Sequence, residues 1–148
     1  MAKNPETGAS AKDSKMMVRR LFEKVWNQND LETAKEIIHT DYSSVENIDF
    51  ASIRGLTILQ EDMKFYREMY SNLKFEIDRM FTHEDTVVSM WRASGVANHE
   101  EFINRRGETQ KKELKAEGAS LTRIADGKII ENRLYWPRYP LFPRASRR

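Results

Sequence analysis

Two polar residues near the C-terminal end of the chain are placed where they could contact a bound ligand. Asn132 shares strand parity with Leu134 and Trp136, so its amide is predicted to face the same apolar side of a strand. An amide on that side needs a hydrogen-bond partner, which is either a ligand or another side chain. Ser120 shares strand parity with Thr122 in the same way, and its hydroxyl could donate a hydrogen bond, although no histidine stands beside it to make it a nucleophile.

Arg92 carries a charge that would demand a partner. It shares one side of a predicted strand with Val88 and Met90, and a guanidinium buried there requires an anion, either a protein carboxylate or the carboxylate of a ligand. The alternative is that this side faces solvent or a second protomer, and that Trp91 is the inward residue. The sequence alone leaves both arrangements open.

Several other chemistries lack the residues that they need. The chain has no cysteine, which excludes disulfides, thiolate chemistry and zinc–sulfur sites. The three histidines, His39, His83 and His99, lack the spacing that puts two ligands on one helix face, so no metal site is predicted. The sequence also contains no glycine-rich phosphate loop and no nucleophile elbow.

Composition places the chain among single-domain globular proteins. It has 148 residues, of which 39% are hydrophobic and 32% charged. No run approaches the roughly 18 apolar residues of a membrane span, and the N-terminus lacks the plan of a signal peptide, so a cytoplasmic protein is expected. The net charge is +2, but residues 137–148 hold four arginines and no acid, which leaves residues 1–136 at −2. Lys111, Lys112 and Lys115 are interleaved with glutamates, which indicates a solvated strand edge rather than a nucleic-acid surface.

The periodicity of the apolar residues changes along the chain from helical to strand-like. Residues 1–12 are polar and aperiodic and are predicted to be a disordered tail. Spacings of three and four predict three helices, in residues 14–26, 31–38 and 57–71, with a short extended segment, 42–48, before the third. A period of two then predicts four strands, in residues 73–79, 87–96, 114–124 and 128–136, with a polar loop at 98–111 and a turn at Ala125-Asp126-Gly127.

Helices followed by a run of strands indicate an α+β fold. A strongly twisted sheet with helices on its concave side would enclose a cone, which is a natural place for a small-molecule cavity. The helical stripes and the strand parity converge on that side. The predicted substrate contacts are therefore Phe22, Trp26, Tyr66, Met90, Arg92, Leu134 and Trp136.

Four segments of the chain match a known sequence pattern in order and spacing. They are Val25-Trp26-Asn27-Gln28-Asn29-Asp30-Leu31, Thr40-Asp41-Tyr42-Ser43-Ser44, Arg54-Gly55, and Leu121-Thr122-Arg123-Ile124-Ala125-Asp126-Gly127-Lys128-Ile129-Ile130-Glu131. Together they resemble the SnoaL-like polyketide cyclases of the nuclear-transport-factor-two-like superfamily. The resemblance implies a conical α+β barrel, with three N-terminal helices packed on a strongly curved, mostly antiparallel sheet. It also implies a single domain at residues 13–142, followed by a basic tail at 143–148.

A chemistry is implied as well. Proteins of this kind are mostly dimeric and cofactor-free, and a carboxylate in an apolar cone takes a proton next to a carbonyl or activates water. Where the cyclases have a histidine and an aspartate, this chain has Ser120 and Leu134, and leucine cannot transfer a proton. In the related ketosteroid isomerase the base falls five residues beyond the position of Asp41, which is Glu46 here. Two further groups of that enzyme, which stabilise the oxyanion, fall on Phe22 and Ser120.

We therefore expect a cofactor-independent cyclase, isomerase or dehydratase of an apolar, carbonyl-containing metabolite, as in natural-product biosynthesis. Glu46 is the expected base, and Asn132 and Ser120 are expected to orient or stabilise the reacting oxygen. The expected partners are a small-molecule substrate and a second copy of the chain, with no cofactor, nucleic acid or membrane. The alternative is a non-catalytic binding or association module that keeps the cone but has lost the family's acid–base pair.

Overall fold

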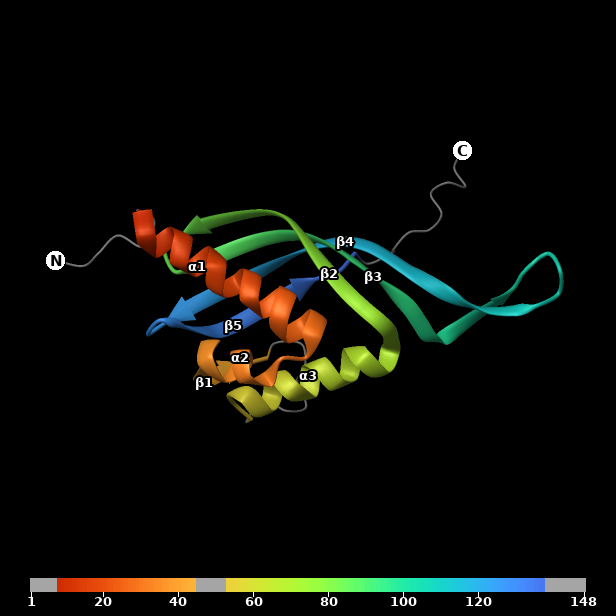
Figure 1. Ribbon diagram of the computed structural model, residues 1–148, viewed down its shortest axis with the longest axis horizontal. Helices are drawn as coiled ribbons and strands as arrows, with labels where there is room; N and C mark the ends of the chain where they lie inside the picture. The colour runs from red at the N-terminus through yellow and green to blue at the C-terminus, as the bar shows by residue number, and fades with distance from the viewer. Residues whose placement is uncertain (1–7, 45–52, 138–148) are drawn as a thin grey trace.

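The computed structural model describes residues 8–44 and 53–137 of the chain (Figure 1). Its elements are α1 (Gly8–Arg20), the π-helical segment η1 (Leu21–Trp26), α2 (Leu31–Ile37), β1 (Ile38–Ser43), α3 (Leu56–Met69), β2 (Tyr70–His83), β3 (Thr86–Ile103), β4 (Thr109–Ala125) and β5 (Lys128–Tyr135). Within these residues no helix is long and apolar enough to cross a bilayer.

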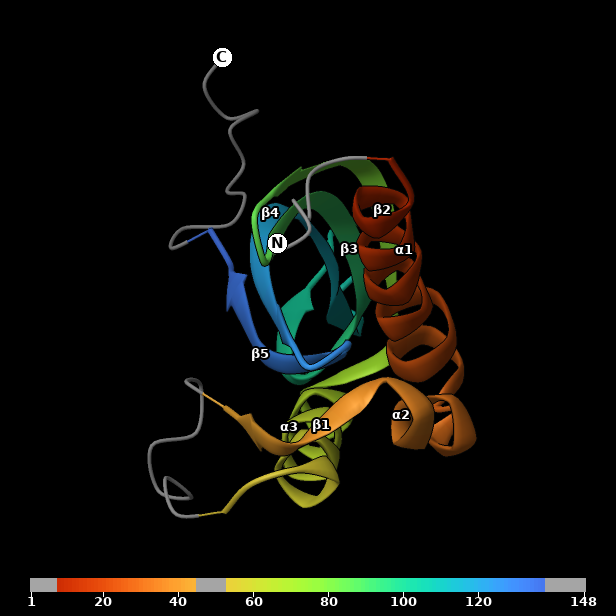
Figure 2. The same ribbon diagram turned by 90° about the vertical axis from the view of Figure 1, so that its left-hand side faces the viewer.

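The strands form one mixed sheet in the order β1-β5-β4-β3-β2. β1 runs parallel to β5, and all other neighbouring pairs are antiparallel. The sheet is curved, and the helices lie along one of its faces (Figure 2). The predicted α+β fold, with three helices on a curved and mostly antiparallel sheet, is confirmed, but β1 and β2 are the outermost strands and the sheet does not close into a barrel.

The first strand begins earlier than the sequence predicts. An extended segment is expected at residues 42–48, whereas β1 starts at Ile38, where the β-branched Ile38 and Thr40 favour extended backbone. The carbonyl of Tyr42 accepts the backbone N–H of Gly55 at 2.7 Å, which ties β1 to the start of α3. Gly55 has a φ of 81°, and an added Cβ would lie 2.9 Å from the carbonyl oxygen of Thr40, so this close approach requires glycine.

The N-terminal helix is longer than predicted. α1 begins at Gly8, so residues 8–12 of the predicted tail are helical in the structure. Residues 1–7 and the predicted basic tail at 143–148 lie outside the described residues.

The predicted polar loop at residues 98–111 is instead the far end of a hairpin. β3 continues to Ile103 and β4 begins at Thr109, in a register that places Glu101 opposite Lys111. This ribbon projects beyond the body of the domain (Figure 1). Its side chains are exposed on both faces, so the apolar alternation that marks a half-buried strand is missing from the sequence.

One core fills the space between the helices and the sheet, and Asn27 helps to fix it. The side-chain amide of Asn27, directly after η1, donates to the carbonyl of Phe75 at 2.8 Å and accepts the N–H of Phe75 at 2.8 Å. Asn27 therefore pairs with the edge of β2 as a neighbouring strand would. This contact holds the last turn of η1, including the buried Trp26, against the sheet.

The predicted hairpin turn between β4 and β5 is confirmed. Asp126 and Gly127 both have positive φ angles, 53° and 76°, as in the type I′ turns whose twist matches that of the flanking strands. The register that follows places Ser120 opposite Leu134 and Thr122 opposite Asn132. The turn therefore brings the polar residues of the two strands together.

Candidate functional site

Side chains alternate between two faces on the central strands. One face packs against the helices and is called the inner face here. Its members are Val87, Ser89, Trp91 and Ala93 on β3, Ala116, Gly118, Ser120 and Thr122 on β4, and Asn132, Leu134 and Trp136 at the C-terminal side. Because several of them are small, the inner face has room for large side chains from the helices.

Aromatic rings occupy that room. They belong to Phe22, Trp26, Tyr66, Phe75, Trp91 and Trp136, which are called the aromatic cluster here. The ring centroids of Trp91 and Trp136 are 4.8 Å apart, and those of Phe75 and Trp91 are 5.1 Å apart. Tyr66 of α3 stacks on Trp136 at 5.7 Å. The rings of the aromatic cluster therefore pack against one another in edge-to-face, tilted and stacked arrangements.

The position of Trp91 depends on the residue that lies directly opposite it on the neighbouring strand β4. Trp91 and Gly118 are directly opposed in the pairing of β3 with β4. A Cβ on Gly118 would lie 2.5 Å from Cη2 of Trp91 and 2.5 Å from the carbonyl oxygen of Tyr135. The indole therefore lies over bare backbone, and a side chain at position 118 would displace it.

Asn132 finds one partner within the protein. The hydroxyl of Thr122 donates to its side-chain oxygen at 2.7 Å, and both residues are buried. The sequence leaves open whether this amide bonds to a ligand or to another side chain, and the structure shows that another side chain bonds to its oxygen. The pair lies one position beyond Ser120 and Leu134 along the inner face.

Ser89 and Ser120 are the least satisfied polar residues of the inner face. They are directly opposed across β3 and β4 and fully buried, and within the described part of the chain neither hydroxyl has a hydrogen-bond partner. The same holds for the indole N–H groups of Trp26, Trp91 and Trp136. Each buried group of this kind forgoes about 1–3 kcal/mol of hydration without compensation. An acceptor atom that reached these donors would recover that free energy.

Asp62 is the only charged residue that is buried among the residues described. It lies on α3, four residues after the buried Ile58 and four before Tyr66 of the aromatic cluster. Sequence patterning overlooks it because the stripe of this helix is defined by its apolar members. The signal that could have found it is its spacing: an acid that lies four residues from an apolar residue on each side belongs to the same buried stripe of the helix. Among the described helical residues Asp62 is the only buried carboxylate, and a carboxylate can act as a general base.

Met90 lies on the outer face of the sheet, which corrects its predicted inward position, and Arg92 lies there too, which is the second of the two arrangements that the sequence leaves open. Met90 is 42% exposed, whereas Trp91 is 1% exposed and is the inward residue. Arg92 donates from Nε and Nη2 to Asp78 at 3.0 and 2.9 Å, and this hydrogen bond holds the pKa of the Asp78 carboxyl below its ordinary value. An indole gains much from burial, whereas a guanidinium would lose its hydration, so the strand turns Trp91 inward.

The remaining predicted contacts are placed as follows. Phe22, Trp26, Tyr66 and Trp136 meet in the aromatic cluster, and Leu134 is buried beside them on β5. Glu46, the expected base, lies outside the described residues. The structure therefore brings the buried aromatic contacts and Leu134 together with Ser120 and Asn132, and it adds Ser89 opposite Ser120.

The sequence matches the model of the SnoaL-like polyketide cyclases over residues 16–143. The chain belongs to this family. No protein with a curated function matches the sequence.

Solved structures share the fold of this SnoaL-like chain. A protein from Jannaschia sp. CCS1, described as a SnoaL-like polyketide cyclase, is 18% identical over 92% of this chain and 90% of its own, with a TM-score of 0.64. A protein from Acidithiobacillus ferrooxidans, described as a polyketide cyclase, is 19% identical over 89% and 92%, with a TM-score of 0.66. IdmH from Streptomyces antibioticus, also described as a polyketide cyclase, is 18% identical over 83% and 91%, with a TM-score of 0.63. At these identities the likeness shows the fold alone.

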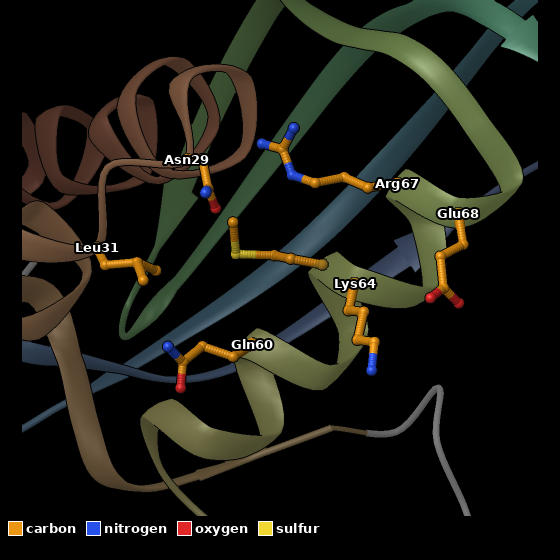
Figure 3. Close-up of a pocket in the computed structure, with 7 residues that line it drawn as sticks. Asn29, Leu31, Gln60, Lys64, Arg67 and Glu68 are labelled. Atoms are coloured by element: carbon orange, nitrogen blue, oxygen red, sulfur yellow. The ribbon is translucent and has the colours of Figure 1, made fainter.

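A separate hollow of about 310 Å³ lies at the surface of the SnoaL-like domain, between the start of α2 and α3 (Figure 3). It is lined by Asn29, Leu31, Gln60, Met63, Lys64, Arg67 and Glu68. Arg67 donates to the carbonyl of Trp26 at 2.7 Å and so fastens α3 to the end of η1. The ionisable side chains of this hollow are exposed, so it offers no buried acid or base. Within the described ranges no group of three or more His, Cys, Asp or Glu side chains could hold a metal ion.

Proposed function

We propose that this SnoaL-like protein is a cofactor-independent cyclase, isomerase or dehydratase that acts on an apolar, carbonyl-containing metabolite of the polyketide type. The observation that carries the proposal is the opposed pair of buried hydroxyl groups, Ser89 and Ser120, neither of which has a hydrogen-bond partner among the described residues, and α3 adds a buried carboxylate, Asp62. Small-molecule sites are usually apolar interiors that contain a small number of polar groups. Family membership adds the expectation of carbonyl chemistry.

In the proposed reaction, a carboxylate removes a proton from the carbon next to a carbonyl, and the electron pair moves onto the carbonyl oxygen. The hydroxyl groups of Ser89 and Ser120 donate hydrogen bonds to the enolate oxygen as its charge develops. The enolate carbon then attacks a second carbonyl carbon of the same substrate and closes a ring. The new alkoxide takes the proton back from the carboxylic acid, so the reaction consumes no cofactor.

Two carboxylates are candidates for the base. Glu46 is proposed from its position relative to Asp41 in the family pattern, and Asp62 is proposed from its burial on α3. Asn132, whose oxygen is engaged by Thr122, retains its amide N–H groups to orient the substrate. Leu134 contributes an apolar contact beside Ser120.

The substrate contacts proposed on the aromatic cluster require movement of some rings. Phe22, Trp26 and Trp91 are buried, whereas Tyr66 and Trp136 are only partly buried. The stacked pair of Tyr66 and Trp136 therefore has the most freedom to separate. We propose that the substrate reaches the inner face by parting these two rings.

The test of this function measures both binding and turnover. The full chain is incubated with a panel of β-diketones and hydroxylated quinones, and bound compounds are found by native mass spectrometry. Turnover of a bound compound is then compared in the wild type, Asp62→Asn, Glu46→Gln and the exposed control Asp78→Asn. We expect one of the first two variants to abolish turnover while it keeps affinity, and the control to behave like the wild type. Wild-type turnover in both would contradict the assignment of the base.

A specific observation favours a second candidate, a binding module without catalysis. The rings of the aromatic cluster are in direct contact, and Leu134 stands where the cyclases have their aspartate. Such a module would bind a compound from the same panel and release it chemically unchanged. Binding without turnover in the wild type would therefore select this candidate.

We also propose that the chain forms a homodimer through the outer face of its sheet. This face exposes Phe81, Met90, Leu121 and Tyr135 across neighbouring strands. An exposed apolar surface that spans several strands marks a protein interface. Sedimentation velocity should show a dimer for the wild type and a monomer for Leu121→Lys. The control Phe65→Lys, on α3, should remain dimeric, and a monomeric wild type would contradict the proposal.

A further inference from the structure

The far end of the β3–β4 hairpin differs from the rest of the domain in charge and exposure. This segment, residues 102–112, is called the hairpin tip here, and it projects away from the body (Figure 1). It carries a net charge of +3, with Glu100, Glu101 and Glu113 at its base, whereas residues 1–101 and 113–136 together carry −5. Phe102 and Ile103 at its end are 43% and 71% exposed. The tip is therefore a basic and apolar projection on an acidic body.

Hydrogen bonds hold the tip in a fixed shape. The side-chain oxygen of Asn104 accepts the backbone N–H groups of Arg106 at 2.9 Å and Glu108 at 3.0 Å. The amide of Asn104 also donates to the carboxylate of Glu108 at 2.9 Å. The one acid of the tip is thus engaged within the turn, while Arg105 and Arg106 are exposed. An ordered tip loses little conformational entropy when it docks.

The two apolar residues of the tip point in opposite directions. Phe102 and Ile103 are consecutive in β3, so they lie on opposite faces of the ribbon, as do Lys111 and Lys112 in β4. Each face therefore combines one apolar and one basic side chain. The headgroup region of a lipid layer surrounds a tip that enters it and so contacts the apolar and basic side chains of both faces at once.

We propose that the hairpin tip docks on an anionic lipid surface. Phe102 and Ile103 enter the headgroup layer, and the surrounding arginines and lysines pair with lipid phosphates. The acidic body is repelled by the same surface, so the tip approaches first. A peripheral contact of this kind needs no spanning segment. It departs from the sequence expectation of no membrane partner, which rests on the lack of such a segment.

Vesicle sedimentation with the full chain tests this proposal. Vesicles of phosphatidylcholine alone are compared with equimolar phosphatidylcholine and phosphatidylglycerol. We expect binding to the anionic vesicles only, and weaker binding as salt is raised. In the double variant Arg105→Ser/Arg106→Ser, the affinity for anionic vesicles should fall at least about tenfold. The control Lys74→Ser/Lys128→Ser removes the same charge from other exposed positions and should bind within about twofold of the wild type.

A second pair of variants tests the apolar contacts. Ile103→Ser should weaken binding to anionic vesicles severalfold, whereas Phe65→Ser, an exposed aromatic on α3, should not. Circular dichroism confirms that each variant is folded. No binding by the wild type, equal binding to both vesicle types, or equal loss in the controls would overturn the proposal. A change from dimer to monomer in the Arg105→Ser/Arg106→Ser variant, with lipid binding unchanged, would also overturn it and make a second copy of the chain the occupant.

Discussion

The two faces of the β3–β4–β5 sheet treat their polar groups in opposite ways. On the outer face, where water is available, Arg92 bonds to Asp78 and Glu131 accepts from Arg133 at 2.7 Å. On the inner face, where water is excluded, the hydroxyls of Ser89 and Ser120 have no partner in the described residues. An unpaired polar group costs free energy only where it is buried, so the inner face gives up stability that the outer face keeps. Departures of this kind are expected where a protein is built to bind something.

The largest expected effect separates two neighbours on β3. Trp91→Ala removes a buried indole that contacts Phe75 and Trp136, and it should lower the free energy of unfolding by about 3–5 kcal/mol. Arg92→Ala, on the outer face, should leave the midpoint of urea denaturation close to that of the wild type. Urea denaturation followed by circular dichroism measures both. Similar losses for the two variants would mean that the faces do not differ as described.

The next effect tests how the inner face makes room for that indole. Gly118→Ala places a Cβ against Trp91 and the backbone of Tyr135, and such overpacking should cost about 1–3 kcal/mol. The near-ultraviolet circular dichroism of the tryptophans should change as well, because the ring must move. Gly107→Ala is the control for the spectrum: Gly107 has a φ of 81°, so the variant also costs stability, but the open space around it means that no tryptophan has to move and the spectrum should be unchanged. A spectrum unaffected by Gly118→Ala would show that the position of Trp91 does not depend on the bare backbone at position 118.

A smaller effect with the opposite sign distinguishes the two kinds of inner-face polar residue. Ser89→Ala and Ser120→Ala remove hydroxyls without partners and should each raise the free energy of unfolding by up to about 1 kcal/mol. Thr122→Val leaves the buried side-chain oxygen of Asn132 without its donor and should lower the free energy of unfolding by about 1–3 kcal/mol. Thermal denaturation is sufficient to rank the three variants. Destabilisation by both serine variants would mean that their hydroxyls have partners in the folded protein, and would weaken the case for a ligand there.

The sequence predicts most of this fold, because burial imposes a period. Helical stripes locate α2 and α3, and the positive-φ turn at Asp126 and Gly127 locates the β4–β5 hairpin. The hairpin tip is missed for the same reason, since a ribbon exposed on both faces has no apolar alternation to detect. β1 begins before its predicted position because two β-branched residues outweigh the end of the helical pattern.

The candidate site is harder to predict, because it depends on which residues face each other. Strand parity places Ser120, Asn132 and Trp136 inward, but it leaves Arg92 and Trp91 undecided until the packing of the opposite strands is known. Nothing in the sequence around Ser89 predicts a site residue. It becomes a candidate only once the register of β3 and β4 shows that it lies opposite Ser120. Asp62 is hidden by the apolar residues around it on α3.

The smallest effect concerns the outer face and its dependence on pH. Hydrogen bonds from Arg133, together with Arg123, hold the pKa of Glu131 below the ordinary glutamate value of 4.5. Because the pKa of Glu131 is lower in the folded than in the unfolded state, its carboxylate stabilises the fold at pH values above the ordinary glutamate pKa. That contribution is lost as the pH falls through the folded-state pKa.

Glu131→Gln should therefore lower the free energy of unfolding by about 1 kcal/mol at neutral pH, and the gap from the wild type should close in acid. Urea denaturation at neutral pH and at several values below the ordinary glutamate pKa measures that gap. Glu61→Gln on α3 controls for the loss of one negative charge. If the gap stays constant or widens as the pH falls, the carboxylate of Glu131 does not stabilise the outer face through its charge. In that case the contrast with the inner face would rest on Arg92 and Asp78 alone.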